Sequence, residues 1–210
     1  MFENGNKQTI SGNKRIILAS GSPRRKELLA GLDIDFEIDT RNNFKEKYSK
    51  DTPHSQITAL MSEGKSLGFH RLLEKNEILI TADTMVLCGD EVLGKPKGND
   101  EREKAADASR MLRLLSGKEH KVLTSVTIRD ITSTDTFTDA ATVLFKDLSD
   151  EEIQYYIRNY RPFDKAGAYG IQEWIGYIGI SSIKGSFYTI MGLPVHLLFS
   201  HLQDFLKHIY

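Results

Sequence analysis

Two adjacent arginines, Arg24 and Arg25, are the residues near the start of the chain whose type and position are best suited to binding or catalysis. The apolar residues 16–19 before them predict a strand, and the sequence after them predicts a helix. Ser22 is a favourable N-cap and Pro23 a favourable first helical residue. Both arginines then fall in the first helical turn, where cations oppose the helix dipole. The pattern indicates a phosphate site, with solvated surface arginines as the alternative.

Asp83 and Lys95 form a second pair of candidates. Asp83 follows the apolar run 78–82, where a buried strand is expected to meet a turn, a usual place for functional residues in α/β proteins. Lys95 comes after a predicted two-residue hairpin turn at Gly89-Asp90. A carboxylate that holds Mg²⁺ and a lysine that neutralises phosphate oxygens suit a triphosphate. A turn-capping aspartate and a solvated lysine are the alternatives.

Two other kinds of site find no support in the sequence. Gly64-Lys65-Ser66 looks like the end of a P-loop, but Ala59 stands where the leading glycine is required. The six histidines are scattered without the spacing of zinc ligands. The single cysteine, Cys88, excludes an intrachain disulfide, and its apolar surroundings favour a buried structural thiol.

The composition is that of an ordinary globular protein. Of 210 residues, 40% are hydrophobic and 27% are charged, which fits one large domain or one domain with two lobes. The formal net charge of −1 argues against binding to nucleic acid or to an anionic membrane. Residues 1–13 are polar and do not resemble a signal peptide. We expect a cytoplasmic protein with a disordered tail at 1–13 and a single domain at 14–210.

The elements that must position these residues alternate between strands and helices. A polar loop is expected from Asp39 to Ser55, and long loops in compact domains are often functional. This order, with hairpins among helices, predicts an α/β fold with a mixed sheet. Strands are expected near 16–19, 34–38, 78–81, 85–93, 120–128 and 137–145, and helices near 23–30, 57–72, 100–116, 149–160 and 193–209.

Five blocks of sequence resemble the Maf family of nucleoside triphosphate pyrophosphatases, over nearly the whole chain from Ile16 to about Leu202. The resemblance implies a long mixed β-sheet with flanking helices that form two lobes around a cleft. It also implies a cytoplasmic, metal-dependent enzyme that hydrolyses a nucleoside triphosphate to the monophosphate and pyrophosphate, and it suggests a homodimer. The blocks are Leu18-Ala19-Ser20-Gly21-Ser22-Pro23-Arg24-Arg25, Ala82-Asp83-Thr84 with Gly94-Lys95-Pro96-Lys97, Leu114-Leu115-Ser116-Gly117 with His120 and Val122, Asp164-Lys165-Ala166-Gly167-Ala168-Tyr169-Gly170-Ile171-Gln172, and Gly185-Ser186 with Gly192-Leu193-Pro194.

The resemblance assigns roles residue by residue. Asp83 matches the catalytic acid, either as a ligand of Mg²⁺ or Mn²⁺ or as the base for the attacking water. Glu46 matches an acidic position that helps to hold the metal. The matching phosphate- and substrate-binding residues are Arg24, Arg25, Lys65 and Lys95.

Lys165 is expected to complete the site, with a structural lysine as the alternative. The chain departs from the family pattern at two places. Lys45 stands where a second acid commonly precedes Glu46, and Gly64 and Ser66 flank Lys65 where helix formers are usual. The first departure makes Glu46 the weakest assignment in the set.

Three positions separate the branches of the family, and here they are Arg24, Thr84 and Gln172, which resembles the branch that acts on dTTP and UTP. The amide of Gln172 offers a donor and an acceptor, which suits the edge of uracil or thymine. Two alternatives remain at this point: a non-catalytic nucleotide-binding regulator of cell division, and a pyrophosphatase for modified nucleotides. From the helix dipole alone, replacing Arg25 with alanine is expected to leave stability unchanged or slightly improved.

Overall fold

The structure is a computed structural model that describes residues 13–207. The tail expected at residues 1–13 lies, apart from Asn13, outside the described residues. Among the described residues, no helix is long and apolar enough to cross a membrane.

The described residues form a seven-stranded mixed sheet with the order β2-β1-β3-β5-β6-β7, and β4 pairs with β3. Strand β1 is parallel to β2 and β3, and the remaining pairs are antiparallel. The mixed α/β architecture expected from the sequence is therefore confirmed. The strands are β1 (Arg15–Leu18), β2 (Phe36–Ile38), β3 (Glu77–Cys88), β4 (Glu91–Leu93), β5 (Glu119–Arg129), β6 (Thr134–Phe145) and β7 (Ile180–Lys184).

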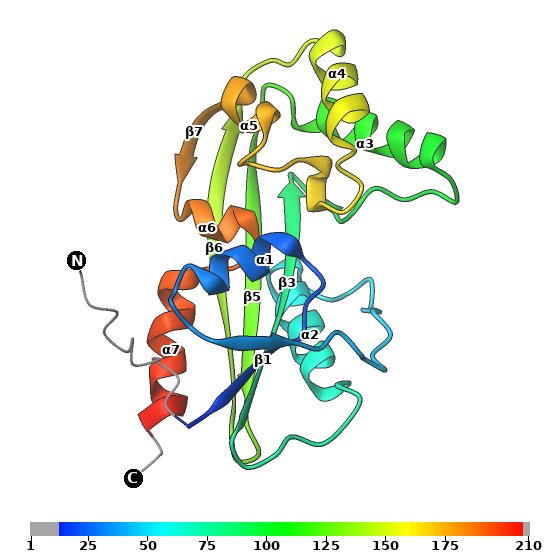
Figure 1. Cartoon of the computed structure of the whole chain (residues 1–210). Coiled ribbons are helices and arrows are strands. Elements are labelled where there is room, and N and C mark those ends of the chain that lie inside the picture. The colour runs from blue at the N-terminus through cyan, green and yellow to red at the C-terminus, as the bar shows by residue number, and fades with distance from the viewer. Residues whose placement is uncertain (1–12, 208–210) are drawn as a thin grey trace, which may run out of the picture.

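The helices gather at the two ends of the long strands β3, β5 and β6 (Figure 1). One group contains α3, α4 and α5, and the other contains α1, α2 and α7. Helix α2 packs on β3 and β5, and α6 packs on β5 and β6. The helices are α1 (Pro23–Ala30), α2 (His54–Leu67), α3 (Glu101–Leu115), α4 (Asp150–Tyr160), α5 (Trp174–Gly179), α6 (Phe187–Met191) and α7 (Val195–Lys207), with a short 3₁₀ turn η1 (Ala166–Ala168).

Local signals placed several helix starts correctly. Ser149 and Glu152 form the capping box at the start of α4, and Asp100 accepts a hydrogen bond from the Glu103 amide at the start of α3. Helix α1 begins at Pro23 after Ser22 as expected, although the Ser22 side chain makes no capping hydrogen bond. The short helices α5 and α6 were not expected, because each is shorter than two turns and lacks a clear apolar period.

Strand β3 differs from the expectation in a way that matters for Asp83. The sequence predicted one strand ending before Asp83 and a second beginning at Met85, but β3 runs unbroken from Glu77 to Cys88. Pairing with β5 continues from Leu79 to Leu87, so the strand is held through the position of Asp83. Asp83 therefore lies inside a strand and not at its end.

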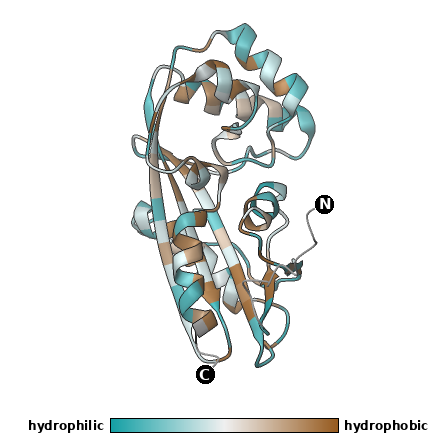
Figure 2. Cartoon of the chain, turned by 60° about the vertical axis from the view of Figure 1, so that its left-hand side comes forward, coloured by the Kyte–Doolittle hydropathy of each residue, from teal (hydrophilic) through white to brown (hydrophobic). Residues whose placement is uncertain are grey.

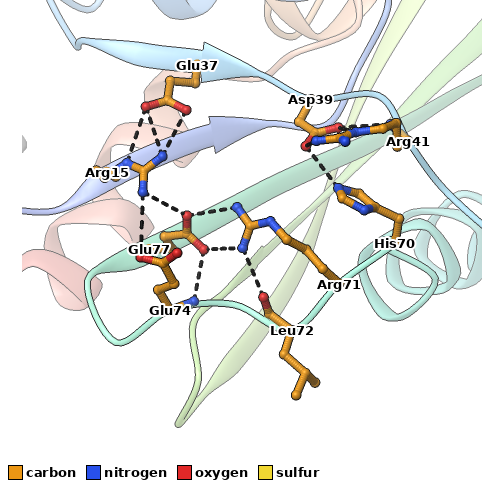
Figure 3. Close-up of polar contacts among 9 residues, drawn as sticks. All are labelled: Arg15, Glu37, Asp39, Arg41, His70, Arg71, Leu72, Glu74 and Glu77. Carbon is orange, nitrogen blue, oxygen red and sulfur yellow. Dashed lines mark hydrogen bonds and ion pairs between the residues drawn. The ribbon is translucent and has the colours of Figure 1, made fainter.

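The core follows the sheet and the helix faces that cover it. Apolar colour concentrates on the strands, and the outward faces of several helices are hydrophilic (Figure 2). Cys88 is buried in this core as expected. The start of β3 is anchored differently, because buried Glu77 accepts hydrogen bonds from Arg71 and pairs with Arg15 of β1 (Figure 3).

Candidate active site

A gap in the sheet beside β3 holds the first site residue, Arg25. Strand β1 pairs with β3 only as far as Ile80, and β4 joins the same edge of β3 at Val86. Between these points the Ala82 carbonyl has no strand partner on that edge and accepts from Arg25 Nη1 at 2.8 Å. Arg25 thus supplies the hydrogen-bond donor that a neighbouring strand would otherwise provide.

The Arg25 guanidinium makes further contacts within the protein. Its Nε donates to the Gly192 carbonyl at 2.8 Å, and its Nη2 donates to Thr84 Oγ1 at 3.0 Å. Burial lowers the pKa of Arg25, and the nearby charge of Asp83 acts in the opposite direction. The prediction that Arg25→Ala leaves stability unchanged or slightly improved considered the helix dipole alone, and these contacts contradict it, because the guanidinium donates to carbonyls of two distant segments.

Asp83 faces the opposite side of β3, toward α2. Lys65 of α2 donates to Asp83 Oδ1 at 2.6 Å and pairs with Glu46 Oε1 at 2.8 Å. The Asp83 side chain is 19% exposed and that of Glu46 is 62% exposed. The hydrogen bond from Lys65 lowers the pKa of Glu46, and the more distant charge of Lys95 lowers it further. The structure therefore brings together Asp83, Lys65 and Glu46, which lie far apart in the sequence.

Arg24 and Lys165 meet through a carboxylate that the sequence reasoning did not assign. Arg24 Nη1 pairs with Asp164 Oδ2 at 2.7 Å, and Lys165 Nζ pairs with Asp164 Oδ1 at 2.8 Å. Lys165 also pairs with Glu173 Oε1 at 3.0 Å. Burial raises the pKa of Asp164, but the bonds from Lys165 and Arg24 outweigh burial and lower it to about 2. This chain of charges joins helix α1 to the segment before η1.

Gln172 follows η1 in the sequence, and its side-chain oxygen is not used within the described part of the chain. This buried Oε1 has no hydrogen-bond partner there. The neighbouring Glu173 is held by Lys165 and by the Tyr156 hydroxyl, which also accepts from the Gly170 amide. A buried acceptor without a partner calls for an explanation, and a ligand that displaces the atoms covering it would supply one.

Thr84 and Lys95 differ in how far their polar groups are used within the protein. Thr84 Oγ1 accepts from Arg25 and lies 3.0 Å from Thr124 Oγ1, so its hydroxyl is used within the protein on the face opposite Asp83. Lys95 is exposed, and no hydrogen bond or ion pair of its ammonium is found among residues 13–207. Its charge nevertheless reaches Glu46.

The pair of carboxylates is the part of the site that fits a divalent cation. Asp83 and Glu46 converge on one ammonium, and Mg²⁺ is typically bound by one or two carboxylates together with substrate phosphates. No group of three or more His, Cys, Asp or Glu side chains that could hold a metal occurs among the described residues. The donor set suits a cation shared with a phosphate ligand and not one held by protein alone.

Comparison with known proteins identifies the family of the chain. Residues 15–205 match the family described as Maf-like protein. The chain belongs to the Maf family. A dTTP/UTP pyrophosphatase of Bacteroides thetaiotaomicron is 49% identical over 189 residues, covering 90% of this chain and 95% of the relative. Similar proteins of the same name occur in Porphyromonas gingivalis, at 47% identity over 91% of this chain and 94% of the relative, and in Flavobacterium psychrophilum, at 45% identity over 91% and 95%.

Sequence reasoning missed the acids that hold the basic residues of this Maf-family site. Asp164 and Glu173 stand at the two ends of the segment that contains Lys165 and Gln172. The signal was present, because a lysine expected to be buried requires a partner charge nearby. Lys165 is 7% exposed and has two such partners.

Proposed function

We propose that this protein hydrolyses nucleoside triphosphates, dTTP and UTP above others, to the monophosphate and pyrophosphate. The observation that carries the proposal is the convergence of Asp83 and Glu46 on Lys65, close to the buried Arg25. The curated relatives named dTTP/UTP pyrophosphatase, at 41–49% identity over most of the chain, support the same reaction.

The reaction places a water oxygen on the α-phosphorus and breaks the bond between that phosphorus and the bridging oxygen to the β-phosphorus. The departing pyrophosphate carries the developing negative charge, so fixed cations stabilise the transition state. Arg24, Lys65 and Lys95 are the proposed cations for the phosphates, and Lys165 supports Arg24 through Asp164. The proposed role of Asp83 is to hold the metal or to accept the proton of the water.

A bound Mg²⁺ or Mn²⁺ would neutralise phosphate charge in this site, and Asp83 and Glu46 would hold it. Both carboxylates pair with Lys65 in the structure, so Lys65 would have to release them and bind phosphate oxygens before they could hold a cation. Each of the three groups then has an oppositely charged partner with and without the ligand.

Gln172 is the proposed reader of the base. Its buried, unbonded Oε1 can accept the N3–H of uracil or thymine, and its NH₂ can donate to a neighbouring carbonyl oxygen. Adenine presents an acceptor at N1 where uracil presents N3–H, so it leaves the Gln172 acceptor unpaired, which costs about 1–3 kcal/mol for a buried group. Guanine offers the same adjacent donor and acceptor as uracil, so its rejection depends on the larger size of the purine ring.

A product assay tests the proposal directly. The protein is incubated with dTTP, UTP, CTP, ATP, GTP and modified pyrimidine triphosphates in Mg²⁺ or Mn²⁺, and ion exchange separates the products. Monophosphate with pyrophosphate is expected from dTTP and UTP, and EDTA should abolish the activity. Diphosphate with phosphate, or no turnover of any triphosphate, contradicts the proposal, and the second result favours a nucleotide-binding regulator.

We propose that the enzyme works in the cytoplasm as one domain over residues 14–210 and assembles as a homodimer. These proposals extend the family resemblance and stand apart from the reaction. Light scattering coupled to gel filtration measures the mass in solution, and a monomer mass near 23.8 kDa contradicts the dimer.

A further inference from the structure

The loop that carries Glu46 packs one aromatic ring, that of Phe44, against α2. Gly64 lies inside α2, where a helix former is the better choice, and Gly68 follows the last residue of the helix. A Cβ added at Gly64 would lie 2.2 Å from the Phe44 ring, and one at Gly68 would lie 2.7 Å from Phe44 Cβ. The two glycines therefore make the space that Phe44 fills.

Hydrogen bonds hold the same stretch of loop against the end of α2. The Asn42 side chain donates to the Lys65 carbonyl at 2.5 Å and accepts from the Phe44 amide at 2.8 Å. The Asn43 amide donates to the Gly68 carbonyl at 2.8 Å. Upstream, Asp39 is bound by Arg41 and His70, which secures the beginning of the loop (Figure 3).

Beyond Phe44 the loop has few attachments. Residues 45–51 are exposed, and the hydrogen bonds described for residues 45–52 are local to the loop. The ion pair between Glu46 and Lys65 is the exception. Phe44 is partly buried against the apolar cluster that includes Met61 and Met85. It is therefore the last firm anchor before Glu46.

We propose that Phe44, seated over Gly64 and Gly68, positions Glu46 against Lys65 and thereby sets how readily the site takes up a divalent cation. This inference rests on the proposed function for the metal role of Glu46. Phe44 itself touches no phosphate in this account and is a positioning residue. Gly64, which weakens α2 as a helix, is then explained by the space that the Phe44 ring needs.

Two single substitutions remove the contact from opposite sides. Phe44→Ala deletes the ring, and Gly64→Ala expels it while giving α2 a better helix former. We expect both variants to expose the loop, so that trypsin cleaves after Lys47 at least about fivefold faster than in the parent, because cleavage follows the population of the open form. Thermal stability of Gly64→Ala should not fall in parallel.

The double variant Phe44→Ala/Gly64→Ala makes the test specific. Without the ring, the three atoms nearest to a Cβ at position 64 are gone, so the double variant should match Phe44→Ala and should not show the sum of both effects. Phe44→Leu should restore most of the protection. Gly31→Ala is the matched control, because Gly31 ends α1 with a right-handed backbone and an added Cβ would lie 3.4 Å from its nearest neighbour.

The second readout is the Mn²⁺ concentration for half-maximal activity. It should rise at least about fivefold in Phe44→Ala and in Gly64→Ala, with kcat at saturating Mn²⁺ largely retained, a split that general destabilisation does not produce. Unchanged trypsin cleavage in both variants overturns the proposal. A loosened loop with an unchanged Mn²⁺ requirement also overturns it.

Glu46→Ala separates this inference from the proposed function. It should raise the Mn²⁺ requirement while the ring still protects the loop. If Glu46→Ala needs no more Mn²⁺ than the parent, the metal role of Glu46 in the proposed function fails. The trypsin result then decides alone whether Phe44 anchors the loop.

Discussion

The floor and the rim of the site are built in different ways. The floor consists of Arg25, Asp83 and Thr84, which are held by β3 and by buried partners. The rim consists of Glu46, Lys95 and Asp164, whose side chains are largely in solvent, with Glu46 62% and Asp164 51% exposed. Floor residues therefore contribute to the fold as well as to the proposed chemistry, whereas rim residues contribute little to stability.

The largest effect is expected from Asp83→Asn. The change keeps the shape of the side chain, and Glu46 still pairs with Lys65, so thermal stability should be nearly unchanged. Turnover of dTTP should fall at least about a hundredfold, the usual scale for loss of an acid–base or electrostatic group. Steady-state kinetics with Asp90→Asn, an exposed turn variant, as control make the comparison, and near-native turnover would remove Asp83 from the mechanism.

Arg25→Ala tests whether the floor belongs to the fold. The Ala82 and Gly192 carbonyls lose their donor, at about 1–3 kcal/mol for each buried group, so the free energy of unfolding should drop by about 2–4 kcal/mol. Arg24→Ala, which removes the ion-pair partner of the rim residue Asp164, should lower activity with a much smaller loss of stability. Urea unfolding measures both, and equal losses in the two variants would erase the distinction between floor and rim.

Gln172 combines features of both regions, because its Oε1 is buried like the floor and unbonded like the rim. The parent should favour dTTP and UTP over ATP and GTP at least about tenfold in kcat/KM, which corresponds to about 1.4 kcal/mol. Gln172→Glu replaces a donor with a negative charge facing a carbonyl oxygen and should erode that preference. An unchanged ratio in the variant would show that another group reads the base.

The smallest effect concerns the ion pair between Arg24 and Asp164. The pKa of Asp164 in the folded protein, about 2, lies below the ordinary value of about 3.9. Burial raises this pKa, but the bonds from Lys165 and Arg24 together lower it by more, so the two pairs jointly add stability above about pH 4 that disappears as the pH falls toward 2. For a half-exposed carboxylate it should amount to about 0–1 kcal/mol.

Comparing the parent with Asp164→Asn by urea unfolding at pH 7 and at pH 3 measures this contribution. The difference in unfolding free energy should shrink at the lower pH. A difference that is the same at both pH values would mean that hydrogen bonding, and not charge, holds Arg24 in place.

Part of this site could be predicted because its signals are local. The start of α1 at Pro23 and the start of the helix expected at 149–160 depend on residues within one turn, and both were correct. The blocks that contain Asp83, Lys95 and Lys165 identified the family for the same reason, since residue types in a short run need no knowledge of folding. Glu46 was placed on a loop correctly, but its partner was not foreseen.

What tertiary structure alone decided is which groups these residues contact. The acceptors of Arg25 lie 57 and 167 positions away in the chain, and no local pattern reports a distance of that kind. The glycine at position 64 reads as a defect of α2 until the Phe44 ring is seen against it. The sequence by itself determined most of the longer elements and the charged groups, because both depend on neighbours in the chain. The packing of distant segments around β3 decided that Arg25 is buried and that Asp83 and Glu46 both pair with Lys65. Packing and hydrogen bonding act between segments that only the fold brings together.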